Sequence, residues 1–182
     1  KKEVITESRE IINSKKLYSK IPEKIYQGIL KKSDNLISES LLANVGYIYT
    51  DTISVDNGID KTLENLSQEI QNGVEWFDGS GLSRYNMVKP KAIIYILNEI
   101  YNYWGLERIK ENFPNNYIIE DKEDFVWGKT GTLKNNHNYS GFITNKKGKY
   151  YIFSIMINHF NSELSDISQS IVDFLLYVNK NG

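Results

Sequence analysis

The chain has 182 residues, of which 40% are hydrophobic and 25% are charged, so it can form one domain around a single core. Its 22 basic and 23 acidic side chains give a formal net charge of −1, which excludes bulk attraction to nucleic acid or to an anionic membrane. The chain has no cysteine, which suits oxidising and reducing compartments alike. No apolar stretch approaches the roughly 20 residues of a membrane span, and no secretory signal pattern is present, so any export signal is expected outside this chain.

The first part of the sequence predicts mainly helices. Residues 1–20 are predicted as strand and turn that lead into a domain at 21–182. From Pro22, apolar residues recur at three-to-four spacing and predict helical segments with Gly46 as a stop. Ser33-Asp34-Asn35 lies inside or between two of these segments. A further helix is predicted from Ile59 to Gly73.

The second part begins with a long helix and continues as strands. Pro90 suits the first helical turn, and one apolar stripe predicts a core face made of Ile93, Leu97, Ile100 and Trp104. Beyond Pro114, aromatic and branched residues predict three strands, at 125–127, 139–144 and 150–158, with a hairpin turn at 145–148. A closing helix after Ser162 is predicted to bury Leu164, Ile167, Ile171, Leu175 and Val178. This order predicts an α/β (α+β) layer structure with an antiparallel meander, and not a doubly wound parallel sheet.

Two short motifs carry candidate chemistry. Lys129-Thr130-Gly131 lies at the end of a predicted aromatic strand, with glycine on both sides of Lys129-Thr130. Bare backbone there lets a peptide hydrogen-bond to the strand edge, although the same glycines also suit a bulge in an edge strand. Ser33 and Asn35 provide a hydroxyl and an amide, which can serve catalysis or simply cap a helix.

A third segment makes the combination more specific. Residues 76–86 read Trp-Phe-Asp-Gly-Ser-Gly-Leu-Ser-Arg-Tyr-Asn, a glycine-rich turn ahead of the Pro90 helix. With Leu30–Leu36 and Glu39, Asp78–Arg84, Lys129–Leu133 and Tyr139–Phe142 in this order, the chain resembles the C-terminal portion of the class C low-molecular-mass penicillin-binding proteins. This is the D-alanyl-D-alanine carboxypeptidase/endopeptidase family of bacterial cell walls.

The resemblance implies a penicillin-binding/β-lactamase-like fold, in which helices cover a five-stranded antiparallel sheet and the strand at 125–133 forms one lip of the cleft. Such enzymes carry three signatures, S-x-x-K, S-D-N and K-T-G. No serine in this chain is followed by lysine three positions later. The resemblance therefore implies that the nucleophile helix and the remaining strands belong to a missing N-terminal half, and that this chain alone is inactive.

The resemblance also implies roles for individual residues. Ser33 would relay a proton between the catalytic lysine and the leaving D-alanine amine, because a hydroxyl both donates and accepts. Asn35 would orient the substrate or the lysine, and Lys129 would supply positive charge beneath the site. Substrate would be bound by a second set of residues, Thr130, Gly131, Thr132, Leu82 and Arg84.

Within that second set, Thr130 and Thr132 would hydrogen-bond the terminal carboxylate and the acyl group. The backbone N–H of Thr132 would form half of an oxyanion hole. Leu82 and Arg84 would line the pocket for the peptide side chain, where a planar guanidinium suits a carboxylate. Arg84 is otherwise read as an exposed turn residue.

The partners implied are peptidoglycan stem peptides, β-lactams as inhibitors and the missing N-terminal half, at an extracytoplasmic location. No cofactor is expected, and His137 and His159 lack the spacing of a metal site or a catalytic triad.

The competing hypothesis is a non-catalytic module that binds wall peptides or a protein. A β-lactamase-like hydrolase is a further alternative, for which no deacylation base is evident. Two features depart from the family pattern: the charged stretch 115–124, and Gly128 where alanine is more usual.

Overall fold

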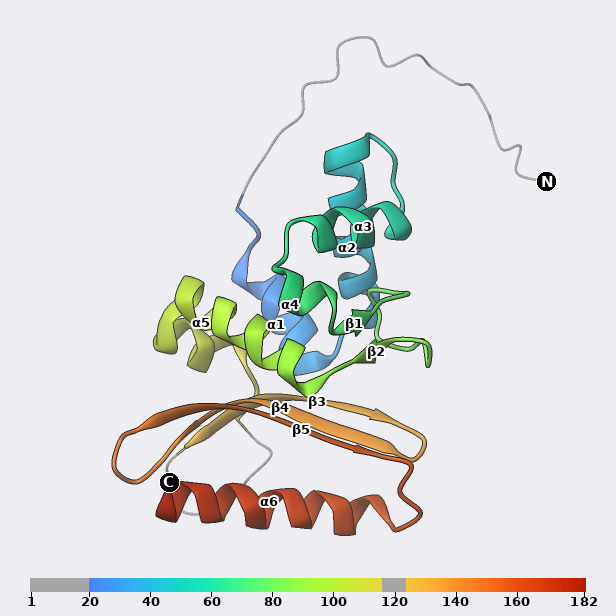
Figure 1. Cartoon of the computed structure of the whole chain (residues 1–182). Helices are drawn as coiled ribbons and strands as arrows, with labels where there is room; N and C mark the ends of the chain where they lie inside the picture. The colour runs from blue at the N-terminus through green and yellow to red at the C-terminus, as the bar shows by residue number, and fades with distance from the viewer. Residues whose placement is uncertain (1–19, 116–123) are drawn as a thin grey trace, which may run out of the picture.

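The computed structural model describes residues 20–115 and 124–182, so the strand and turn predicted at 1–20 lie outside the described residues except for Lys20. A body of helices covers one face of a sheet, and a single long helix runs along the other face (Figure 1). The helices are α1 (Glu23–Lys32), α2 (Asn35–Thr50), α3 (Val55–Glu64), α4 (Gln68–Gln71), α5 (Pro90–Asn112) and α6 (Leu164–Asn181). The strands are β1 (Val74–Glu75), β2 (Met87–Val88), β3 (Val126–Leu133), β4 (Asn136–Thr144) and β5 (Tyr150–Asn158).

The helices α1 and α2 are separate, and the break falls at Ser33-Asp34. The predicted stop at Gly46 is wrong, because Gly46 lies inside α2. A Cβ atom at Gly46 would lie 2.2 Å from the carbonyl oxygen of Ser54 and 3.0 Å from the backbone nitrogen of Gly58. Glycine is therefore present because α3 approaches the backbone of α2 at this point, and not because the helix ends.

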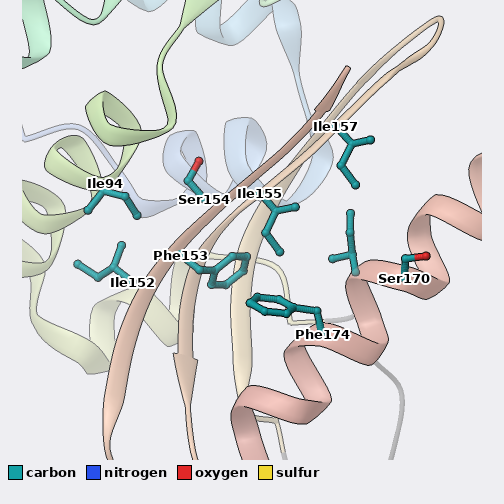
Figure 2. A pocket seen from close by; sticks show the side chains of 9 residues that line it. Ile94, Ile152, Phe153, Ser154, Ile155, Ile157, Ser170 and Phe174 are labelled. Carbon is teal, nitrogen blue, oxygen red and sulfur yellow. The ribbon is translucent and has the colours of Figure 1, made fainter. Parts of the chain in front are cut away.

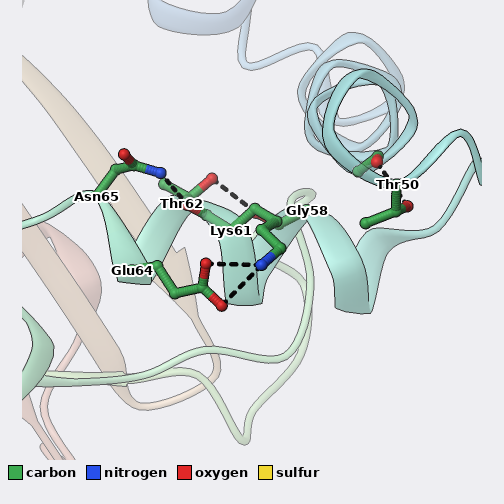
Figure 3. Close-up of polar contacts among 7 residues, drawn as sticks. Thr50, Gly58, Lys61, Thr62, Glu64 and Asn65 are labelled. Atoms are coloured by element: carbon green, nitrogen blue, oxygen red, sulfur yellow. Dashed lines mark hydrogen bonds and ion pairs between the residues drawn. The ribbon is translucent and has the colours of Figure 1, made fainter.

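The single helix predicted from Ile59 to Gly73 is wrong at its start and in its middle. It begins at Val55, where the hydroxyl of Ser54 caps the N-terminus by accepting from Asn57 N–H at 3.2 Å. It ends at Glu64, where the Asn65 side chain donates to the Lys61 carbonyl at 2.7 Å (Figure 3) in place of the Asn65 backbone N–H, which donates to the Thr62 carbonyl at 3.1 Å. The short helix α4 follows after a break.

The long helix α5 packs its predicted stripe into the core. Leu97 is buried, and Ile93, Ile100 and Trp104 pack against the same cluster, which includes Trp127 and Phe142 from the sheet. Gly105 has φ 70° and ψ 170°, so the helical path is interrupted just after this stripe. The two-stranded pairing of β1 with β2, on either side of the glycine-rich loop, was not predicted.

The antiparallel meander is confirmed, with strand order β3-β4-β5. Strand alternation sends Trp127 and Phe142 toward α5, whereas Val126, Tyr139 and Ile143 pack with Ile171 and Leu175 of α6. The register places Lys129 opposite Ser140. The predicted turn at 145–148 is also confirmed, since Gly148 N–H donates to the Asn145 carbonyl at 2.9 Å.

The closing helix α6 matches its prediction except at the first residue. Ile171 and Leu175 are buried, and Ile167 and Val178 pack against the same cluster, but Leu164 is 41% exposed because it begins the helix before the turns that contact the sheet. None of the helices in residues 20–115 and 124–182 combines the length and hydrophobicity of a membrane span. The α/β fold class is confirmed, and the main sheet has three strands in the described part of the chain.

Candidate active site

The three motif segments meet around one cavity of about 460 Å³. The turn between α1 and α2 forms one wall, the glycine-rich loop forms the second and β3 forms the third. The residues that line it are Ile29, Ser33, Asp34, Asn35, Ser38, Gly79, Ser80, Gly81, Leu82 and Lys129–Leu133. Segments that are far apart in sequence therefore share one pocket.

Ser33 stands at the turn between the two helices. Its φ of 52° is in the left-handed region, which non-glycine residues adopt infrequently. The turn is held by the Asp34 N–H, which donates to the Gly28 carbonyl at 3.0 Å, and by the Asp34 carboxylate, which accepts from Ile37 N–H at 3.0 Å. These two hydrogen bonds, one to each helix, stabilise the left-handed conformation of Ser33 at the pocket.

Asn35, the first residue of α2, connects this turn to the glycine-rich loop. With its amide nitrogen facing the available acceptors, the side chain donates to the carbonyl oxygens of Ser33 and Ser80, both at 3.1 Å. The amide therefore holds two walls of the pocket together.

Ser38 and Glu39 reinforce the same contact from the next turn of α2. The Ser38 hydroxyl donates to the Gly79 carbonyl at 2.5 Å. The Glu39 carboxylate accepts the backbone N–H groups of Gly79 and Ser80, both at 2.7 Å. Ser38 was not among the predicted site residues, although its spacing of three from Asn35 puts both on one face of a helix.

Asp78 organises the glycine-rich loop from within. One carboxylate oxygen accepts from Gly81 N–H and from the Asn86 amide, both at 2.8 Å, and the other accepts from Ser83 N–H at 2.7 Å. Burial alone would raise the pKa of the Asp78 carboxyl, but the hydrogen bonds from Asn86, Ser83, Gly81 and Ser80 together hold that pKa below its ordinary value. Gly81 has φ 75°, a conformation that favours glycine at this turn.

One of the two predicted binding residues of the glycine-rich loop lines the pocket. Leu82 lines the cavity, whereas Arg84 is exposed and is absent from the lining. The predicted role of Leu82 is compatible with this position. Arg84 is not brought into the pocket in this structure, and its role remains a prediction.

Lys129 provides the cation of the site. Its ammonium donates to the Thr130 carbonyl at 2.6 Å, and burial lowers the pKa of the Lys129 amine. Among the described residues, no other lysine or arginine lines this cavity. A half-buried ammonium attracts an anionic ligand more strongly than an exposed one, because solvent screens it less.

The two glycines of the motif strand differ in their surroundings. A Cβ atom at Gly128 would lie 2.7 Å from the Tyr139 ring and 2.8 Å from the Ser140 carbonyl oxygen, so packing between strands requires glycine there. A Cβ atom at Gly131 would meet nothing within 4 Å. The protein's own packing therefore does not require glycine at position 131, which leaves room for a ligand beside the strand.

Thr132 contacts His137, for which the sequence predicted neither a metal site nor a catalytic triad. The distance between Thr132 Oγ1 and His137 Nδ1 is 2.8 Å across the β3–β4 pair. His137 is 4% exposed, and burial lowers the pKa of its imidazole. The two residues are 5 positions apart on either side of a tight hairpin, and this short separation in the sequence could have predicted the contact.

A larger cavity of about 590 Å³ lies between the outer edge of β5 and the helices on either side of it (Figure 2). Its lining is mostly apolar, with Ile155 and Phe174 among its members and the hydroxyls of Ser154 and Ser170 as its polar groups. None of the described residues that line it has an ionisable side chain, so the candidate chemistry lies in the smaller cavity. Within residues 20–115 and 124–182, no group of three or more His, Cys, Asp or Glu side chains is placed to hold a metal ion.

The smaller cavity thus combines an ammonium, several hydroxyls and the edge of β3, which no second strand of the described part of the chain covers. These groups can bind the carboxylate end of an extended peptide, with the backbone of β3 pairing alongside it. Within the described residues, no lysine follows a lining serine at the spacing of a nucleophile pair.

The chain is similar to a described protein family along most of its length. The sequence model of the D-Ala-D-Ala carboxypeptidase 3 (S13) family matches residues 14–178. D-alanyl-D-alanine carboxypeptidase DacB of Haemophilus influenzae is 29% identical over 168 residues, which cover 82% of this chain and 34% of that protein. The chain therefore spans about a third of the length of this curated relative.

Two solved structures are also similar to the chain. Penicillin binding protein 4 (dacB) from Haemophilus influenzae, complexed with a β-lactam, superposes with a TM-score of 0.74 at 27% identity, covering 86% of this chain and 41% of that one. A predatory endopeptidase from Bdellovibrio bacteriovorus, in complex with an immunity protein, superposes with a TM-score of 0.65 at 15% identity, covering 87% of this chain and 43% of that one. At 15% identity, the similarity to the Bdellovibrio bacteriovorus endopeptidase concerns the fold alone.

Proposed function

The chain belongs to the D-Ala-D-Ala carboxypeptidase 3 (S13) family, and on that premise we propose that it is the C-terminal part of a serine-type D-Ala-D-Ala carboxypeptidase or endopeptidase. The complete enzyme would act on peptidoglycan peptides through an acyl-enzyme and would bind penicillins. The observation that carries this proposal is the single cavity shared by Ser33, Asn35 and Lys129. The enzyme would work outside the cytoplasm, where its wall substrate is found.

In the proposed mechanism, Lys129 attracts the terminal carboxylate of the peptide, and the hydroxyls of Thr130 and Thr132 hydrogen-bond it. The peptide lies along β3, where the open space beside Gly131 admits it. Leu82 contacts the peptide from the opposite wall of the cavity. These groups bind and orient the substrate before any bond is broken.

The proton transfers would pass through Ser33. Its hydroxyl accepts a proton from the catalytic lysine of the missing signature and passes it to the departing D-alanine amine. Asn35 keeps this hydroxyl in place, because its amide joins the Ser33 turn to the glycine-rich loop. The Thr132 N–H would donate to the oxyanion, and the second donor would be the N–H of the nucleophile.

The nucleophile is proposed to come from another part of the polypeptide. This is supported by the absence of S-x-x-K from the sequence and by the 34% share of the relative that the chain spans. The apolar groove beside β5 is proposed as a place where that part of the polypeptide packs (Figure 2). A strand added there would pair with the edge of β5 that no strand of the described residues occupies, and would cover Phe174, which is 52% exposed.

The test of ligand recognition is a titration of the chain with N-acetyl-D-Ala-D-Ala, followed by amide chemical shifts. We expect shifts at Lys129, Thr130 and Gly131, and weaker shifts with N-acetyl-L-Ala-L-Ala. Replacing the ammonium in Lys129→Met should weaken binding by about tenfold or more, since a hydrogen bond to a charged group contributes about 1.5–3 kcal/mol. Binding that is unchanged in this variant, or the absence of binding to the unmodified chain, would contradict the proposal.

A further inference from the structure

The cross-strand pair Thr132 and His137 determines the direction in which the Thr132 hydroxyl can donate a hydrogen bond. Thr132 of β3 lies directly opposite His137 of β4, and the distance between Thr132 Oγ1 and His137 Nδ1 is 2.8 Å. Thr132 lines the pocket and is exposed, whereas His137 is 4% exposed. The imidazole therefore contacts the Thr132 hydroxyl from the buried side, and ligand would contact it from the pocket side.

The Thr132 hydroxyl has a single proton, so its two neighbours compete for it. When Nδ1 of His137 carries no proton, the hydroxyl donates to the ring and presents only lone pairs to the pocket. When Nδ1 carries a proton, the ring donates to Oγ1, and the hydroxyl proton is available to a ligand. The protonated atom of the imidazole thus decides whether Thr132 acts as an acceptor or a donor.

A carboxylate can only accept hydrogen bonds, so it requires the second arrangement. We propose that His137 is a positioning residue for the carboxylate site: a carboxylate-terminated peptide binds at Thr132 only with Nδ1 of His137 protonated and donating to Thr132 Oγ1. This inference rests on the proposed function, because that function supplies the carboxylate. It assigns His137 a role that acts through Thr132, without contact between the imidazole and the substrate.

Burial of the ring favours a change of tautomer over a gain of charge. Burial lowers the pKa of His137, which disfavours the imidazolium form. A neutral ring has one proton, which resides on Nδ1 or on Nε2. Ligand binding is therefore expected to select the tautomer that carries the proton on Nδ1, with no change in the net charge of the pocket.

The direct test is ¹⁵N NMR of the imidazoles in the full chain. The sequence has two histidines, so the His159→Asn variant assigns the signals of His137. Asparagine also suits the left-handed backbone at position 159, where φ is 59°. With N-acetyl-D-Ala-D-Ala, the His137 Nδ1 signal should reach the protonated range. With the C-terminal amide of the same peptide, whose NH₂ group can donate to Thr132, it should stay nearer the free-state value.

Variants separate this role from simple packing. His137→Phe removes the donor and should reduce the preference for acid over amide by about tenfold, and His137→Asn, which retains an N–H donor, should restore part of it. Thr132→Val should lose the same preference, and adding it to His137→Phe should cause no further loss. Thermal unfolding of each variant reports whether it is folded, and the NMR test on the unmodified chain holds even if His137→Phe is not.

The outcomes separate the two proposals. If N-acetyl-D-Ala-D-Ala binds while the Nδ1 signal of His137 stays unprotonated, this inference is wrong and the proposed function stands. If acid and amide give the same Nδ1 shift, the inference is likewise wrong. If the unmodified chain binds neither peptide, both proposals fail.

Discussion

The carboxylate of Glu39 accepts the backbone N–H of Gly79 at 2.7 Å, although the two residues are 40 positions apart in sequence. It accepts Ser80 N–H at the same distance, and Ser38 donates to the Gly79 carbonyl. This part of the glycine-rich loop is therefore attached to α2 by side chains at neighbouring positions of the helix. The shape of the pocket depends on that attachment, because Gly79, Ser80 and Ser38 all line it.

Glu39→Ala should destabilise the fold and weaken ligand binding together. Two hydrogen bonds to a half-buried carboxylate are lost, and two N–H groups lose their acceptor, for which we expect a cost of about 2 kcal/mol in the free energy of unfolding. Urea denaturation measures the loss, and hydrogen exchange at Gly79 and Ser80 should become faster. The matched control is Glu64→Ala, which removes only the exposed ion pair with Lys61 (Figure 3) and should cost less than about 0.5 kcal/mol. Equal losses in the two variants would contradict this account.

The two glycines of the motif strand should respond differently to alanine. Gly128→Ala places a methyl group against the Tyr139 ring and the Ser140 carbonyl, and should cost about 1–3 kcal/mol of stability. Gly131→Ala should leave the stability unchanged or raise it by about 0.5–1 kcal/mol, because the site is open and alanine reduces the freedom of the unfolded chain. Its affinity for N-acetyl-D-Ala-D-Ala should nevertheless fall by about tenfold. Full ligand affinity in Gly131→Ala would show that the space beside the strand is not used.

Asp78 should make stability depend on pH in the acidic range. Its folded-state pKa lies below its ordinary value, so its contribution is fully present above the unfolded-state pKa of about 3.9 and is lost as the pH falls through the folded-state pKa. Asp78→Asn should therefore be less stable than the unmodified chain at neutral pH, with a difference that shrinks below about pH 4. Unfolding free energies measured from pH 7 to pH 2.5 check this. A difference that stays constant over this range would rule out the carboxylate as its source.

Fluorescent penicillin should leave the isolated chain unlabelled after denaturing electrophoresis. Covalent labelling needs a serine activated by a nearby lysine, and the sequence has no S-x-x-K pair. A longer polypeptide that supplies this pair should be labelled, and Ser33→Ala in that polypeptide should be labelled more slowly. Labelling of the isolated chain would refute the proposal that the nucleophile lies elsewhere. A complete polypeptide without S-x-x-K that still binds the peptide would favour the non-catalytic module.

Much of the fold could be predicted because local patterns determine it. The stripe on α5 and the meander β3-β4-β5 follow from hydrophobic periods of 3.6 and 2 residues. The predictions at Gly46 and at 59–73 failed because their causes are tertiary or involve side chains. Gly46 is needed where two helix backbones approach, and the Asn65 side chain replaces a backbone hydrogen bond of α3.

The candidate site divides in a similar way. Ordered motifs predicted that Ser33, Asn35 and Lys129 lie together, and all three line one cavity, while their catalytic roles stay predictions. The contacts that fix these motifs in space, from Ser38 to Gly79 and from His137 to Thr132, join residues whose partners only the folded chain identifies. Arg84 shows the converse, because a residue can belong to a motif and still stand outside the cavity when its loop turns away.

The outer edge of β5 has a consequence for handling this chain. Within the described residues no strand pairs with that edge, and the apolar groove runs beside it. An open edge next to half-buried Ile side chains and the exposed Phe174 is a template for edge-to-edge association of identical molecules. Self-association of the chain should therefore increase with its concentration. A charged substitution such as Phe174→Lys should reduce this association without touching the pocket that holds the motifs.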